Sequence, residues 1–226
     1  PDLGSSLDYE CYNAFVRAGF NLFTVGPISD TVSWPERVEH AFWRSYKRLT
    51  GKSGLKFPIT TSMRASRCLK DSIETCQPDV VFSIFQPFYI FQKPQKPCVW
   101  YFDTTFLGQE AEWPLYGRLP LEFSVWQEKR AFQNCQRIVT MSLWSKEILL
   151  RCYGVPEHLI EIVPLFATLP AENIPERIDI FNDKRIQFPL RLLLVGRVYE
   201  RKGIDIAIQI VQQLNAQGLP AELTVC

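Results

Sequence analysis

Two cationic side chains, Arg197 and Lys202, are the clearest chemical feature of this 226-residue sequence. Arg197 ends an apolar run at 190–197 that is typical of a buried strand, and Lys202 comes just before an apolar, helix-like segment at 204–217. In an open α/β sheet, the carboxyl end of a strand and the amino terminus of the next helix lie together and attract anions. The pattern therefore predicts an anion-binding site between this strand and this helix.

The same turn contains a glycine that gives a ligand access to the backbone. Gly196 has no side chain, so phosphate oxygens could approach its peptide closely. Arg197 can bind two phosphate oxygens at once, and Lys202 can add a point charge beside it. We interpret Gly196, Arg197 and Lys202 as a pyrophosphate-binding group. The alternative is that both cations are solvated surface charges, which is the usual state of Lys and Arg.

Short apolar runs alternate with amphipathic segments along most of the chain. The segment at 35–49, for example, carries Val38, Phe42, Tyr46 and Leu49 at helical spacing. This alternation is typical of parallel βαβ units and predicts a doubly wound, Rossmann-like α/β fold. We expect helices at 8–18, 35–49, 60–76, 120–134, 143–152 and 204–217, and strands at 21–25, 79–85, 98–102, 137–141, 160–163, 190–197 and 222–226.

The pattern also predicts two domains. Residues 1–165 form a Rossmann-like domain with a parallel sheet, and residues 190–226 form the first βαβ unit of a second one. Between them, residues 166–189 contain several prolines and mixed charges, so we expect a linker. Residues 1–6 resemble the loop after a strand, and the chain stops within a strand. We therefore expect both domains to be truncated, the first without its first strand.

The composition argues against several classes of protein. A formal net charge of +1, with no dense run of Lys or Arg, argues against nucleic-acid binding. The seven cysteines are scattered with no C-x-x-C pair, which is typical of reduced thiols in a cytoplasmic protein. His40 and His158 have no ligand at metal-binding spacing, so we expect no metal site. No apolar run approaches the roughly 18 residues of a membrane span.

Two stretches of the sequence resemble a known enzyme family. The first, at 193–203, contains LLVGR followed by ERKG, and the second, at 137–164, contains RIVTMS, YGVP and IEIVP. In residue type, order and spacing they resemble the retaining GT-B glycosyltransferases of group 1, also called family 4. The resemblance is clear over 135–226 and mostly architectural over 1–134.

This resemblance implies a nucleotide-sugar-dependent glycosyltransferase with two facing Rossmann-like domains. The donor would be a nucleotide sugar such as a UDP- or GDP-sugar, and its diphosphate would contact Arg197 and Lys202. Transfer would retain the anomeric configuration and need no metal or other cofactor. The family's pair of glutamates would lie beyond residue 226, so no catalytic residue is named, and we expect residues 1–226 alone to be inactive.

The resemblance also points to three candidate cleft-lining residues. Gly4 and Ser5 fall near the family's glycine-rich loop, although Ser5 replaces a second glycine there and has the alternative role of a helix cap. Asp103 follows the strand at 98–102, where the family often has His-Asp, and Phe102 stands in place of that histidine. The alternative role of Asp103 is an Asx turn or cap.

Other functions and partners stay open at this point. The same architecture suits a sugar-nucleotide epimerase or a non-catalytic, two-lobed binding protein. The acceptor would be a sugar, a lipid or another molecule. A lipid acceptor would make the cytoplasmic protein membrane-peripheral, and the basic, aromatic segment 43–48 could then lie against anionic lipid. A solvated helix face is the alternative for that segment.

Overall fold

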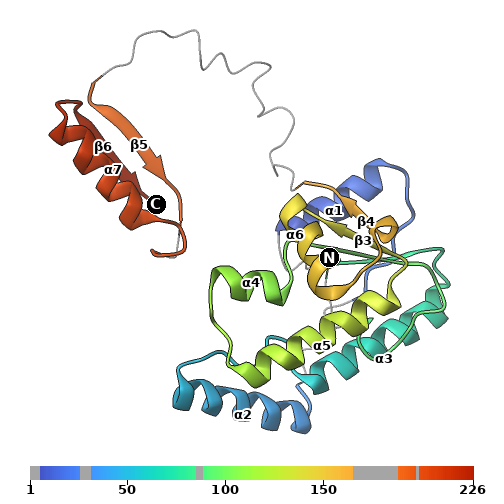
Figure 1. Cartoon of the computed structure of the whole chain (residues 1–226). Helices are drawn as coiled ribbons and strands as arrows, with labels where there is room; N and C mark the ends of the chain where they lie inside the picture. The colour runs from blue at the N-terminus through green and yellow to red at the C-terminus, as the bar shows by residue number, and fades with distance from the viewer. Residues whose placement is uncertain (1–5, 26–31, 85–88, 165–187, 197–198) are drawn as a thin grey trace. The chain divides into compact units, whose positions relative to one another are not determined.

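The computed structural model describes residues 6–25, 32–84, 89–164, 188–196 and 199–226 (Figure 1). The chain divides into two compact units, Pro1–Thr168 and Leu169–Cys226, called unit 1 and unit 2 below. Each unit contains a parallel sheet with helical connections. The predicted Rossmann-like α/β fold class is therefore confirmed.

Unit 1 is built on a four-stranded sheet whose strands pair in the order in which they occur along the chain. All neighbouring strands run parallel, which requires a crossover between each pair. The strands are β1 (Val81–Ser83), β2 (Cys98–Phe102), β3 (Arg137–Thr140) and β4 (Ile160–Ile162).

The described residues of unit 1 form six α-helices, and two short irregular helical turns precede β4. The helices are α1 (Ser6–Arg17), α2 (Trp34–Thr50), α3 (Ile59–Cys76), α4 (Phe106–Glu112), α5 (Arg118–Asn134) and α6 (Leu143–Ile148). The turns are the π-helix η2 (Leu149–Tyr153) and the 3-10 helix η3 (Glu157–Leu159).

Alternation along the strands separates the two faces of this sheet. Trp100 and Phe102 of β2 point to one face, where the Trp100 ring stacks on Phe132 of α5 with centroids 4.7 Å apart. Helices α3 and α5 lie side by side on this face and supply much of the core (Figure 1). Helix α1 contacts the sheet through Phe15, whose ring lies 4.9 Å from Phe82 of β1.

The structure contradicts one predicted strand. Residues 21–25 are irregular, and Phe23 is 59% exposed. Among the described residues no strand pairs with this run. An apolar segment becomes a strand only where a neighbour satisfies its N–H and C=O groups, so its composition alone was a misleading signal. Val25 packs against the core without such pairing.

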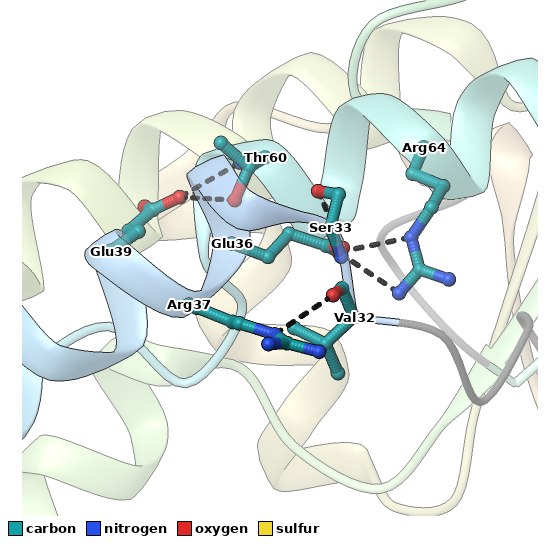
Figure 2. A network of polar contacts seen from close by, with 7 residues as sticks. All are labelled: Val32, Ser33, Glu36, Arg37, Glu39, Thr60 and Arg64. Atoms are coloured by element: carbon teal, nitrogen blue, oxygen red, sulfur yellow. Dashed lines mark hydrogen bonds and ion pairs between the residues drawn. The ribbon is translucent and has the colours of Figure 1, made fainter.

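A polar network joins α2 to α3 (Figure 2). Glu36 accepts hydrogen bonds at 2.9 Å from Arg64 and from the N–H of Ser33. One turn later, Glu39 accepts from the first two N–H groups of α3 at 2.7 and 2.9 Å, and from the Thr60 hydroxyl. Burial raises the pKa of each carboxyl, but the hydrogen bonds outweigh it, so both pKa values are lowered.

Replacement of Glu39 tests this cap of α3. Glu39→Ala should lower the free energy of unfolding by about 1–2 kcal/mol, because two N–H groups at the start of α3 lose their acceptor. Urea denaturation measures the loss. Glu74→Ala, which removes an exposed carboxylate from the same helix, should change stability by less than about 0.5 kcal/mol. Equal losses in the two variants would contradict the capping role.

The described residues of unit 2 form one βαβ element. Its strands β5 (Leu190–Leu194) and β6 (Ala221–Val225) pair in parallel, and α7 (Ile204–Ala216) connects them. The side chain of Asn215 bonds both the N–H and the carbonyl of Ala221, at 2.9 and 3.0 Å, and so fixes the turn from α7 into β6. Residues 166–187 of the predicted linker lie outside the described residues.

Candidate functional site

The end of β5, the turn after it and the start of α7 form the candidate donor site in unit 2. The N–H of Gly196 donates to the carbonyl of Cys226 at 2.7 Å, which continues the β5–β6 pairing by one step. Gly203 adopts a left-handed φ of 66°, a conformation that glycine allows at little cost. Its carbonyl accepts the first helical hydrogen bond of α7, from Ala207 at 2.9 Å. The glycine thus ends the turn and begins the helix.

Lys202 packs directly on Gly196. A Cβ atom added to Gly196 would lie 2.5 Å from Cγ and 2.8 Å from Cβ of Lys202. The aliphatic stem of Lys202 therefore occupies the space that the missing side chain leaves, a space in which the sequence suggested ligand access. Lys202 itself is exposed. The structure brings these two predicted site residues together, whereas Arg197 lies outside the described residues.

In unit 1, Asp103 lies where the carboxyl ends of β2 and β3 meet. Its carboxylate accepts a hydrogen bond from the N–H of Thr104 at 2.7 Å. Its carbonyl accepts one from the Ser145 hydroxyl of α6 at 2.5 Å. Ser142, which follows β3, caps α6 by accepting from the N–H of Ser145. Helix α6 therefore holds the backbone of Asp103 at this edge of the sheet, and the Asp103 side chain is exposed.

The start of α4, just after Asp103, is fully capped by side chains. Its first three N–H groups, from Phe106 to Gly108, donate to Glu128 (2.9 Å), Tyr153 (3.4 Å) and Thr105 (3.1 Å). A helix start binds anions through such N–H groups when they lack internal acceptors. Because these three are already bonded within unit 1, they are not available to a phosphate.

Glu128, which bonds the start of α4, is deeply buried. It is 2% exposed, and it also accepts a short hydrogen bond from the Tyr153 hydroxyl. Burial raises the pKa of Glu128 to about 8, although the hydrogen bonds from Tyr153 and Phe106 oppose the shift. Burial and the nearby Glu128 raise the pKa of Tyr153 as well. Through these hydrogen bonds Glu128 holds the start of α4.

The comparison with known families decides the identity of unit 1. The sequence profile of Glycosyltransferase Family 4 matches residues 9–167, which run from α1 to just beyond β4. The chain belongs to this family. The resemblance stated from the sequence is thereby confirmed, and glycosyl transfer from a donor to an acceptor is the activity of the family domain. No curated protein matches the chain.

The other residues considered in the sequence of this family 4 glycosyltransferase add no side-chain contact to the candidate site. Gly4 and Ser5 lie outside the described residues. His40 and His158 are both exposed. Within the described ranges, no group of three His, Cys, Asp or Glu side chains could hold a metal ion. Across the same part of the chain, no helix combines the length and apolar character needed to cross a membrane.

Proposed function

We propose that this family 4 glycosyltransferase takes its sugar from a nucleotide-diphosphate donor and retains the anomeric configuration. One observation carries the proposal: the Lys202 stem packs on Gly196 at the end of β5, next to the amino terminus of α7. Arg197 follows Gly196 in the sequence and adds a second cation. Two cations at a strand end beside a helix start suit an anionic diphosphate.

The proposed chemistry is electrostatic. As the sugar leaves its donor, negative charge accumulates on the oxygens of the departing nucleoside diphosphate. Cations held in place before the reaction favour that transition state over the ground state, which raises kcat. Lys202 would act as a point charge and Arg197 would bind two oxygens, while the start of α7 adds partial positive charge. This arrangement could neutralise the leaving group without a metal ion.

A cytoplasmic location is part of the same proposal. All seven cysteines are free thiols, as is usual in a reducing compartment. Two of them, Cys98 and Cys135, are buried within unit 1, and burial raises the pKa of Cys98 to about 12. These two thiols behave as core residues rather than as reactive groups.

Product analysis tests the proposal on the full natural protein that contains this chain. The protein is incubated with a panel of UDP- and GDP-sugars and simple sugar acceptors. We expect release of nucleoside diphosphate and a product whose anomeric NMR coupling matches that of the donor. An inverted product, or transfer from no nucleotide sugar, would contradict the proposal. An epimerised donor formed without acceptor would favour the epimerase, and binding without turnover would favour the binding protein.

A further inference from the structure

The side of α2 that faces the rest of unit 1 is polar and aromatic. Glu36 and Glu39 bond Arg64 and the start of α3, as Figure 2 shows. Trp43 lies against Gly54, where an added Cβ would come within 2.7 Å of the indole. The Trp43 and Tyr46 rings pack edge to face, with centroids 5.7 Å apart. These residues recur every three or four positions and define the inward face of α2.

A second side of α2 is apolar and exposed. Trp34 is 76% exposed, Val38 50%, Phe42 59% and Leu49 86%. At 3.6 residues per turn, these four side chains fall within an arc of about 80°. The middle of that arc lies about 120° round the helix from the middle of the inward face, and Phe42 at its edge packs on Trp43 with ring centroids 4.8 Å apart. We call these four residues the outer face of α2. The usual orientation of a surface helix, with its apolar face inward, is reversed here.

The charge exposed on α2 is positive. Its only acidic residues, Glu36 and Glu39, are those on the inward face, where Arg64 and the start of α3 take up their charge. All the exposed charged side chains of α2 are cations, namely Arg37, Arg44, Lys47 and Arg48. By helical spacing, the three arginines border one side of the outer face. The helix therefore presents apolar groups and cations together.

This combination fits one kind of surface in particular. A helix lying in the plane of a bilayer places apolar side chains at the boundary of the acyl chains and Lys or Arg against anionic headgroups. We propose that α2 docks unit 1 onto an anionic lipid surface through Trp34, Val38, Phe42 and Leu49. The polar network of the inward face holds the helix with its outer face exposed, even in the absence of lipid. None of the residues proposed for the donor site takes part.

The structure changes the contact that the sequence suggested for this helix. Segment 43–48 was the candidate, but Trp43 and Tyr46 are half-buried on the inward face. The aromatic part of a lipid contact is therefore Trp34 and Phe42. The three basic residues of that segment, Arg44, Lys47 and Arg48, remain exposed, and the two arginines border the outer face.

Vesicle co-sedimentation of the full natural protein tests the proposal. The probes are vesicles of phosphatidylcholine alone and of equal parts phosphatidylcholine and phosphatidylglycerol. We expect binding to the anionic vesicles only, and weaker binding at raised salt. Phe42→Ser combined with Leu49→Ser should lower partitioning at least about tenfold, and Arg44→Gln combined with Arg48→Gln by a similar factor.

A matched control separates this face from general exposed apolar surface. Leu143 of α6 is 62% exposed, close to the value for Phe42, and Leu143→Ser should leave partitioning unchanged. Far-UV circular dichroism should match between variants, and loss of the Phe42–Trp43 ring contact should lower the midpoint of thermal unfolding by no more than a few degrees. Their affinity for a nucleotide sugar without vesicles should also be unchanged, so loss of docking is distinguishable from failure of the donor site.

Three results would overturn the proposal. One is failure of the wild-type protein to sediment with anionic vesicles. Another is unchanged partitioning of the Phe42→Ser, Leu49→Ser variant. The third is a concentration-dependent dimer that this variant abolishes while no form binds vesicles, because a second copy of the chain would then cover the outer face.

Discussion

Lys202→Ala should lower kcat/KM for the nucleotide-sugar donor by at least about 100-fold in the full natural protein. The expected loss is large because Lys202 is one of two cations proposed to face the departing diphosphate. The protein should stay folded, since the Lys202 side chain is exposed. Steady-state kinetics with a UDP- or GDP-sugar measures the effect.

Arg191→Ala is the matched control for this variant. Arg191 is an exposed cation at the other end of the same strand, β5, so its removal changes the net charge equally. Donor kinetics should be unchanged within about twofold for this control. Arg197→Ala should resemble Lys202→Ala, because the two cations share one ligand in the proposal. Unchanged kcat/KM in both site variants would reject their assigned roles.

Glu128→Gln should remove a pH dependence of stability that the wild-type chain shows between about pH 4.5 and 8. The pKa of Glu128 rises from 4.5 to about 8 on folding, because burial disfavours its charged form. Between these values the native state keeps a proton that the unfolded chain has lost, so the free energy of unfolding falls as pH rises. The contribution is complete below about pH 4.5 and lost by about pH 8, at about 1.4 kcal/mol per pKa unit.

Urea denaturation at several pH values measures this difference. Gln keeps the size of the side chain and an acceptor for the Phe106 N–H, but it does not titrate. Its stability curve should therefore be flatter than that of the wild type, and parallel curves would contradict the assignment.

Glu128→Ala should instead destabilise unit 1 at every pH, by about 3–4 kcal/mol. It leaves a cavity, and it leaves the Phe106 N–H and the Tyr153 hydroxyl without the acceptor they have in the native state. Glu122→Ala, an exposed position on the same helix, should cost less than about 1 kcal/mol. Comparable losses at the two positions would show that Glu128 is not the buried cap of α4.

Most elements of the fold could be predicted because their signals are local. The strand at 98–102 has the bounds expected from its unbroken apolar run, and the helix at 60–76 begins only one residue earlier, as α3. Helix α4 was missed because seven residues are too few to show a helical period. Its start is stabilised mainly by Glu128 and Tyr153, which come 22 and 46 residues after the N–H groups they bind.

The candidate donor site was partly predictable for a similar reason. Gly196 and Lys202 are close in sequence, so a strand–turn–helix pattern was enough to place them near each other. The Lys202 stem filling the space at Gly196 was not predictable, because turn geometry depends on the left-handed Gly203 and on the bond from Gly196 to Cys226.

The sequence alone determined where α2 begins, because the Ser33–Glu36 pair forms a capping box at its start. It also determined that α2 has one apolar side, because that depends only on helical spacing. Only the tertiary structure decided which side faces inward. Hydrophobic periodicity predicts that the apolar side is buried, since burial of apolar groups is usually the larger gain. Here Arg64 and the first N–H groups of α3, whose own N-cap residue Pro58 offers no side-chain acceptor, bond two carboxylates of α2 instead. Those partners lie in a helix that the sequence of α2 does not contain.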